Sequence, residues 1–511
     1  MLLRPSILPL LGKRTVSSSL KYNATSLSTL LLKQKSFASK NEQLAKRAYS
    51  FKPSSSLSNA IEKKPSLSNE RPTIVNLSNK EFENIFETKN RQEPLVENFN
   101  AATSKKLMKS KRPINSDPRV AYWLLFVSSL VFAIIFIGGL TRLTESGLSI
   151  TEWKPITGAI PPLSQADWEE EFEKYKDSPE FKQLNSHMNL EDFKYIFYYE
   201  WGHRLLGRGI GLVFVLPMFY LLISKKYTSY RTNKRLFAMA GLLGLQGFIG
   251  WWMVKSGLDA DELMDRKSKP TVSQYRLTTH LSTALVLYLG MLYTSWEILR
   301  ENKWLKDPKK AIELLKVLEN PQLKKLRGIS RFLLVFAFAT AMSGGMVAGL
   351  DAGLIYNSFP KMGETWFPSS GELINSHYLH VNDDPKKDLF WRNILENPTT
   401  VQLIHRYMAI TTFSLIMATQ FYVIKMKKRG IVPRYLSKTM HGVIGIASAQ
   451  VALGIATLIY IVPIPLASLH QCGAIFLLTW CALFNFKIGK GRPIIRQGLV
   501  MMEKKGLNLY K

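Results

Sequence analysis

The fold of this chain is decided by the stretch Glu200-Trp201-Gly202-His203-Arg204, which opens an apolar segment long enough to cross a bilayer. Histidine is rare in such segments, because an imidazole in hydrocarbon needs a partner that water no longer supplies. Four of the eight histidines nevertheless open such segments, at His203, His280, His405 and His470. Four imidazoles at one depth predict a built site.

Eight apolar segments follow one another along the chain, each about as long as a bilayer is thick. We expect helices at about 120–140, 202–223, 236–254, 277–296, 330–350, 402–424, 439–461 and 466–486. The fold class is therefore an all-α membrane protein with eight transmembrane helices.

The first four segments resemble the last four, which is an internal repeat. Residues 138–148 match residues 344–354 in spacing, and Gln246 and Gly250 match Gln450 and Gly454. The two His-Arg pairs also correspond, at residues 203–204 and 405–406. The sequence predicts two pseudo-symmetric four-helix bundles, at 118–300 and 329–490, joined by a connection at 301–328.

Basic residues in the connections set the expected orientation, since positive loops stay on the side of insertion. Residues 224–235 and 425–438 carry five and six basic residues and no acid, whereas residues 142–199 carry eleven acidic against six basic residues. The basic connections and the tail at 491–511 are expected inside. The four histidines then lie near the outer surface.

The N-terminal residues have the composition of a mitochondrial presequence. Residues 1–41 contain seven basic residues, many serines and no acid. We expect a presequence at 1–50, a polar matrix-side arm at 51–117, and a multi-pass protein of the mitochondrial inner membrane with both termini in the matrix. The net charge of +30 then serves targeting, topology and contact with inner-membrane lipid, and nucleic-acid binding is excluded.

Each predicted bundle holds one histidine on its second helix and one on its fourth, which suits the axial ligation of a haem iron between facing helices. Arg204 and Arg406 directly follow two of these histidines and are candidates for binding haem propionates. Zinc or copper usually needs three or four ligands in one place and fits less well. The plainer alternative is that these histidines are helix-terminal residues satisfied by water or headgroups.

The two halves of the repeat differ in charge at the position three residues before the first histidine of each half. Glu200 stands three residues before His203, whereas Gln402 stands three before His405. That spacing places Glu200 on the helix face of its histidine, and only the first bundle has this acid. We expect a charge or proton role for Glu200; the alternative is a solvated residue at a helix start. From the residues, the protein is an enzyme acting on one haem, a b-type electron-transfer cytochrome, or a haem carrier.

The stretches at 141–148 and 200–204, with the repeated His-Arg pair and the histidines of helices 4 and 8, resemble the mitochondrial haem A synthase family. The resemblance covers about residues 118–490. It implies oxidation of a porphyrin methyl of haem O to a formyl group, giving haem A for cytochrome c oxidase. In that reading His203 and His280 bind the substrate haem O, His405 and His470 hold a resident haem b, and Glu200 lies near the reacting methyl.

The same resemblance implies two partners, a haem O synthase and a ferredoxin-type electron carrier, and a homo-oligomer is compatible with it. The chain lacks the outer-loop cysteine pair of some bacterial members, since its two cysteines, Cys472 and Cys481, both fall in the last helix. Thiol chemistry in the outer loops is therefore not expected. His377 and His380 are expected to be solvated.

Overall fold

The computed structural model describes residues 112–224, 227–379 and 384–505. The predicted presequence, most of the predicted arm at 51–117, and His380 lie outside the described residues. Within those ranges the chain is helical, and its β-structure is limited to one isolated bridge between Met362 and Thr365.

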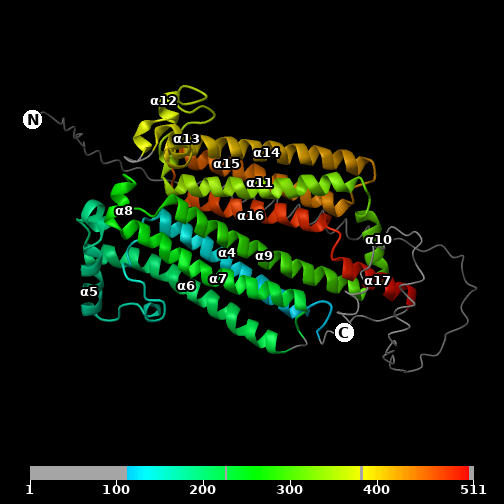
Figure 1. Ribbon diagram of the computed structural model, residues 1–511. Coiled ribbons are helices and arrows are strands. Elements are labelled where there is room, and N and C mark those ends of the chain that lie inside the picture. The colour runs from blue at the N-terminus through cyan, green and yellow to red at the C-terminus, as the bar shows by residue number, and fades with distance from the viewer. Residues whose placement is uncertain (1–111, 225–226, 380–383, 506–511) are drawn as a thin grey trace, which may run out of the picture. The chain divides into compact units, whose positions relative to one another are not determined.

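Eight long helices run side by side through the described part of the chain (Figure 1). They are α4 (Pro118–Leu143), α6 (Leu190–Ile223), α7 (Tyr230–Leu258), α9 (Gln274–Lys306), α11 (Leu323–Gly349), α14 (Pro398–Lys428), α15 (Arg434–Ile459) and α16 (Ile464–Ile488). Seven of them are long and apolar enough to cross a membrane, and α9 is not among these. Threonine, serine and tyrosine interrupt the apolar run of α9, which explains the difference from the eight predicted spans.

Shorter helices gather at the two ends of this array (Figure 1). The loop end carries α5 (Gln165–Lys176), α8 (Ala260–Asp265), α12 (Ser370–Leu373), α13 (Pro385–Glu396) and the single turns η1 (Thr157–Ala159), η2 (Phe181–Asn185), η3 (Ala352–Leu354) and η4 (Ser376–Tyr378). The tail end carries α10 (Pro308–Leu318) and α17 (Pro493–Lys505).

The helices that carry the histidines begin earlier than the apolar pattern predicts. In α6 the side chain of Asn189 accepts from the backbone N–H of Asp192, whose side chain bonds back to the cap, so the helix starts at Leu190. The added turns bury Phe193 and Phe197 against α5. The prediction that the histidines open their helices was therefore wrong in detail: α6 and α14 begin at the polar caps Asn189 and Asn397, and α9 and α16 begin before their predicted runs without a side-chain cap.

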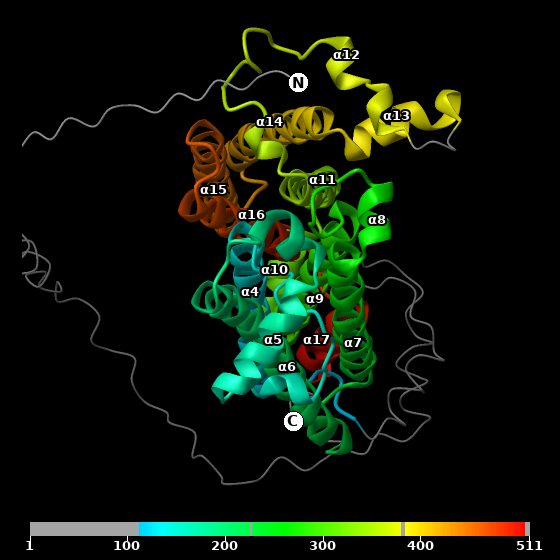
Figure 2. The ribbon, with the colours of Figure 1, turned by 90° about the vertical axis from the view of Figure 1, so that its left-hand side faces the viewer.

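The long helices pack in two sets, which we term the first half (α4, α6, α7, α9) and the second half (α11, α14, α15, α16). Within the first half α4 packs against α6 and α9, and α7 against α9; within the second half α11 packs against α14 and α16, and α15 against both (Figure 2). The halves meet where α9 contacts α11 and α16 contacts α4.

Glycines let the halves approach one another at the loop end. A Cβ at Gly139 would lie 1.6 Å from Oε1 of Gln471, so a larger residue there would have to displace the Gln471 side chain of α16. At the matching position of the second half, a Cβ at Gly345 would lie 3.2 Å from Oγ1 of Thr278 on α9. The second glycine of each Gly-Gly pair thus serves contact between the halves.

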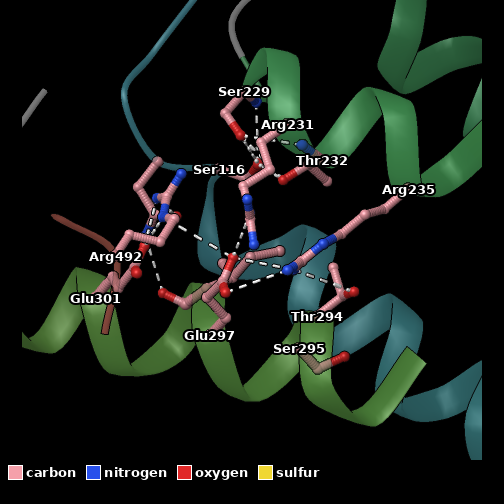
Figure 3. A network of polar contacts seen from close by, with 12 residues as sticks. Ser116, Ser229, Arg231, Thr232, Arg235, Thr294, Ser295, Glu297, Glu301 and Arg492 are labelled. Carbon is pink, nitrogen blue, oxygen red and sulfur yellow. Dashed lines mark hydrogen bonds and ion pairs between the residues drawn. The ribbon is translucent and has the colours of Figure 1, made fainter. Parts of the chain in front are cut away.

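The tail end is held by a buried ionic network (Figure 3). Glu301 on α9 is fully buried and pairs with Arg492, which precedes α17 and also donates to Oδ1 of Asn115 at 3.1 Å. Glu297 accepts from Arg235 of α7 at 2.9 Å. These contacts tie α17, α7 and the chain before α4 to α9.

Candidate haem-binding and active site

One cavity collects all four predicted histidines. His203 on α6, His280 on α9, His405 on α14 and His470 on α16 line a cavity of about 1890 Å³ whose walls are mainly apolar. The cavity reaches the loop end, where Trp153 and Lys269 are among its lining residues. All four predicted histidines therefore line the same cavity.

The histidines form two pairs, one in each half. The rings of His203 and His280 lie close enough to interact electrostatically, and so do those of His405 and His470. In each pair one ring comes from α6 or its counterpart α14, and the other from α9 or its counterpart α16. Each pair therefore supplies two imidazoles from facing helices to one side of the cavity.

Each histidine ring lies against a glycine of a neighbouring helix, and we term these four glycines the glycine seats. A Cβ built on a seat would come within 2.8 to 3.3 Å of Cε1 of the facing ring. The seats are Gly138 for His203, Gly250 for His280, Gly344 for His405 and Gly454 for His470. All four occupy matching positions in the two halves, so the sequence repeat is a repeat of histidine environments.

Two glutamines, one turn before the glycine seats of α7 and α15, bond the backbone of the histidines that these seats face. Gln246 donates from Nε2 to the backbone oxygen of His280 at 3.2 Å, and Gln450 donates in the same way to His470 at 2.9 Å. Both side chains line the cavity and leave Oε1 buried without a partner among the described residues. The repeated Gln-x-x-x-Gly motif thus fixes the backbone and leaves room for the ring.

Glu200 lies on the cavity wall of the first half with both carboxylate oxygens engaged. It is 3 % exposed; its Oε1 accepts from Arg204 at 2.5 Å, and its Oε2 accepts from Ser149 at 2.7 Å and from the backbone N–H of Ile150 at 2.8 Å. The carboxylate therefore joins α6 to the loop that follows α4, and it is not the solvated residue of the plainer alternative.

Gln402, the uncharged counterpart of Glu200, also anchors a loop in the second half. Its Nε2 donates to the backbone oxygens of Ala352 and Tyr356 at 2.8 and 3.3 Å. Both residues belong to the loop after α11, the counterpart of the loop held by Glu200. Loop anchoring is thus common to the two halves, whereas a carboxylate on the cavity wall at this position belongs to the first alone.

The two predicted propionate-binding arginines also line the cavity, and both donate to loop backbone. Arg204 donates to the oxygens of Ile150 and Glu152 at 3.0 and 3.2 Å. Arg406 donates to the oxygen of Ser358 at 2.9 Å and to two further carbonyls of the same loop. In this structure the arginines close the loops over the cavity.

Sequence reasoning missed two residues of the cavity region. Arg208 lines the cavity, donates to the backbone oxygens of Lys154 and Pro155, and leaves one buried nitrogen without a partner among the described residues. Its position, one helical turn after Arg204, was the available signal. The second missed residue is Ser343, which bonds His405. A comparison of the two halves does not single it out, because the corresponding residue of the first half is Ile137.

The outer-loop histidine His377 is exposed and lies in η4, and it is not among the residues that line the cavity. Its partner in the predicted pattern, His380, falls outside the described residues.

Residues 121–482 match the family described as cytochrome oxidase assembly protein, COX15-CtaA. The chain is 58 % identical over 389 residues to "Heme A synthase COX15" of Saccharomyces cerevisiae, covering 76 % of this chain and 79 % of that protein. It is 43 % identical over 365 residues to the human protein of the same name, covering 70 % and 80 %. A "Heme A synthase-mitochondrial ferredoxin fusion protein" of Schizosaccharomyces pombe is 49 % identical over 365 residues, covering 71 % of this chain and 58 % of the fusion protein. The resemblance predicted from the motifs is confirmed, and the chain belongs to the COX15-CtaA family of cytochrome oxidase assembly proteins.

Proposed function

We propose that this chain is a haem A synthase, which oxidises a porphyrin methyl of haem O to the formyl group of haem A. The product serves cytochrome c oxidase. His203 and His280 bind the substrate haem O, and His405 and His470 hold a resident haem b. The observation that carries the proposal is the pair of matched histidine sites in one cavity, of which only the first has a buried carboxylate, Glu200, three residues before its histidine.

The residues of each half fit haem, since two histidines there would hold its iron. Each pair of rings faces an apolar cavity, and the glycine seats keep the backbone clear of each ring. A cavity of about 1890 Å³ exceeds the range of roughly 300–1,000 Å³ usual for one small-molecule site, as two bound macrocycles require. The resident haem, when bound, supplies one-electron redox chemistry next to the substrate.

Glu200 acts as the acid–base or charge-stabilising group of the first half. A carboxylate that lines an apolar wall can accept a proton or stabilise positive charge as hydrogen leaves the substrate methyl. Arg204 and the donors of the loop after α4 hold the carboxylate in place. In the second half Gln402 holds the corresponding loop and brings no charge, which suits a haem that is not itself converted.

The eight long helices are transmembrane spans, and the two halves are four-helix bundles related by an axis along the membrane normal. The 33 residues of α9 measure about 50 Å at 1.5 Å per residue, more than the roughly 30 Å of a hydrocarbon core. α9 also packs against α4 and α7 of its own half and against α11. Such a helix, flanked on several sides by protein, tolerates more polar residues than one facing lipid.

The protein lies in the mitochondrial inner membrane with its tail end in the matrix and its loop end toward the intermembrane space. This orientation follows the basic connections, which all fall at the tail end. A ferredoxin-type carrier delivers electrons; the fusion of a heme A synthase with a mitochondrial ferredoxin in Schizosaccharomyces pombe supports this partner. A haem O synthase supplies the substrate.

The proposal is tested by co-expressing the chain with a source of haem O and separating the extracted haems by chromatography. Wild type accumulates haem A, and His203→Ala retains only haem O. A b-type cytochrome or a haem carrier would copurify with haem while leaving the haem composition unchanged in both. That result would overturn the enzyme assignment.

A further inference from the structure

Among the four histidines, only His405 has a side-chain hydrogen-bond partner on Nδ1 within the described residues. Nδ1 of His405 lies 2.8 Å from Oγ of Ser343 on α11. The same Oγ lies 2.7 Å from the backbone oxygen of Thr340, to which it donates. Ser343 therefore connects the ring of one helix to the backbone of another.

This geometry fixes the tautomer of His405. A serine hydroxyl has one hydrogen, and the Ser343 hydrogen is given to Thr340, so Oγ meets the ring as an acceptor. Nδ1 of His405 must then carry the proton and donate. Nε2 is left with its lone pair free to ligate iron.

The other three rings lack such a partner. Nδ1 of His203, His280 and His470 is buried and has no side-chain hydrogen-bond partner among the described residues. In the first half the residue aligned with Ser343 is Ile137, which has no acceptor on its side chain. The two rings sit alike, since Nδ1 lies 3.4 Å from the Cβ position built on Gly138 and 3.6 Å from that on Gly344.

We infer that Ser343 is a positioning residue that makes His405 the firmly held ligand of the resident haem, whereas His203, without this partner, releases its haem. The inference rests on the proposed function, in which one haem stays and the other passes through. An imidazole that donates its Nδ1–H keeps its orientation and becomes a stronger donor to a metal at Nε2. A substrate site benefits from the opposite property, because its product must leave.

Further contacts brace Ser343 itself. Its acceptor Thr340 pairs through Oγ1 with Oγ1 of Thr412 on α14, at 2.7 Å. Thr412 lies two helical turns beyond His405 on the same helix. α11 and α14 are thus held in register beside the Ser343–His405 bond, which gives the ring one preferred orientation.

The test compares Ser343→Ala with Ser343→Thr, which keeps the hydroxyl, in purified full-length protein loaded with haem. Two readouts report on the ligand rather than on the overall fold: the rate of haem transfer to a soluble haem scavenger, and the redox midpoint potential with the low-spin spectrum. Ser343→Ala should lose its b-type haem roughly 10-fold to 100-fold faster, the range found for lost partners of metal-bound histidines. Its midpoint potential should rise, because a weaker donor stabilises ferric iron less.

Ser343→Thr should stay close to wild type in both readouts. Wild-type retention and potential in Ser343→Ala would overturn the inference. Should Ser343→Ala not fold, Ile137→Ser decides: it should slow the release of haem from the first half, and an unchanged release rate would overturn the inference. His405→Ala distinguishes a failure of the inference about Ser343 from a failure of the proposed function. Haem b that survives His405→Ala would refute the proposed function itself, whatever the result for Ser343.

Discussion

A histidine that ligates a metal between packed helices needs space as well as a partner, and glycine provides the space at all four positions. The closest seat is Gly454, where a Cβ would come within 2.8 Å of Cε1 of His470. Position 445, on the same helix, is also glycine, and a Cβ there would meet nothing within 4 Å. The two glycines therefore form a matched pair for testing the seats.

We expect Gly454→Ala to displace the His470 ring and to lower the haem b content of the purified protein. Overpacking of this kind costs about 1–3 kcal/mol, which is roughly a 5-fold to 150-fold loss of haem affinity. Gly445→Ala should leave the haem content unchanged, since both variants gain the same helix propensity. Haem-to-protein ratios from pyridine haemochrome spectra check this. Equal ratios in the two variants would contradict the role of the seats.

The sequence predicted the histidines of the cavity and the residues that correspond between the two halves, because the repeat displays such positions twice. The four histidines, Gly250 and Gly454, and the contrast between Glu200 and Gln402 were all visible as matched positions. The role of Ser343 could not be predicted from the sequence, because it depends on the His405 ring, which approaches from another helix. The contacts of Arg204 with loop carbonyls likewise depend on how the loop after α4 folds back, which local pattern does not encode.

At the level of elements, α5, η2 and the start of α6 form an aromatic cluster at the loop end that holds a buried acid. Glu180 is 4 % exposed and accepts a hydrogen bond from the hydroxyl of Tyr175 at 2.9 Å. Burial raises the pKa of its carboxyl from 4.5 to about 8. Glu180 also lines the cavity, so this cluster borders the proposed substrate site.

The raised pKa of Glu180 makes the stability of this region depend on pH. Between pH 4.5 and about pH 8 the unfolded chain loses the proton while the folded chain keeps it, so stability falls by roughly 1.4 kcal/mol per pH unit. Glu180→Gln removes this dependence. Its melting temperature should match wild type near pH 4.5 and exceed it increasingly up to pH 8. A constant difference across that range would show that Glu180 does not carry a raised pKa.

The tail-end network gives a second prediction about elements. Arg492→Ala leaves Glu301, which is fully buried, without its partner and should destabilise the protein by about 3–5 kcal/mol. Arg231→Ala removes an arginine whose side chain is 53 % exposed and should cost less than about 1 kcal/mol. Thermal unfolding in detergent compares the two. Similar losses of stability would mean that the network does not anchor α17 to α9.

The helix starts were the least predictable elements. Hydropathy locates an apolar run, but the start of a helix depends on polar caps such as Asn189 before α6 and Asn397 before α14. The apolar runs therefore placed the cores of the helices correctly and their first turns too late. The mixed composition of α9 was also hard to interpret from the sequence. It is tolerated because other helices cover several sides of α9.

For the whole molecule, the spanning of α9 is the feature that most needs a direct test. Asp261 in α8 and Lys309 in α10 flank α9 at its two ends, and both are exposed. Single cysteines at these positions, with Cys472 and Cys481 replaced by serine, can be labelled in mitochondria with a ruptured outer membrane. An impermeant maleimide should label Asp261→Cys and not Lys309→Cys. Labelling of both or of neither would contradict a spanning α9, and labelling of Lys309→Cys alone would reverse the orientation.

In this nearly symmetric molecule one carboxylate, that of Glu200, distinguishes the half in which we expect the chemistry to occur. The most direct measurement is the haem A formed by Glu200→Gln in cells that supply haem O, against the control Glu191→Gln, an acid 79 % exposed in the first turn of the same helix. We predict that Glu200→Gln keeps both haems and forms roughly 10²-fold to 10⁴-fold less haem A, while Glu191→Gln matches wild type. Undiminished haem A in Glu200→Gln would contradict the account.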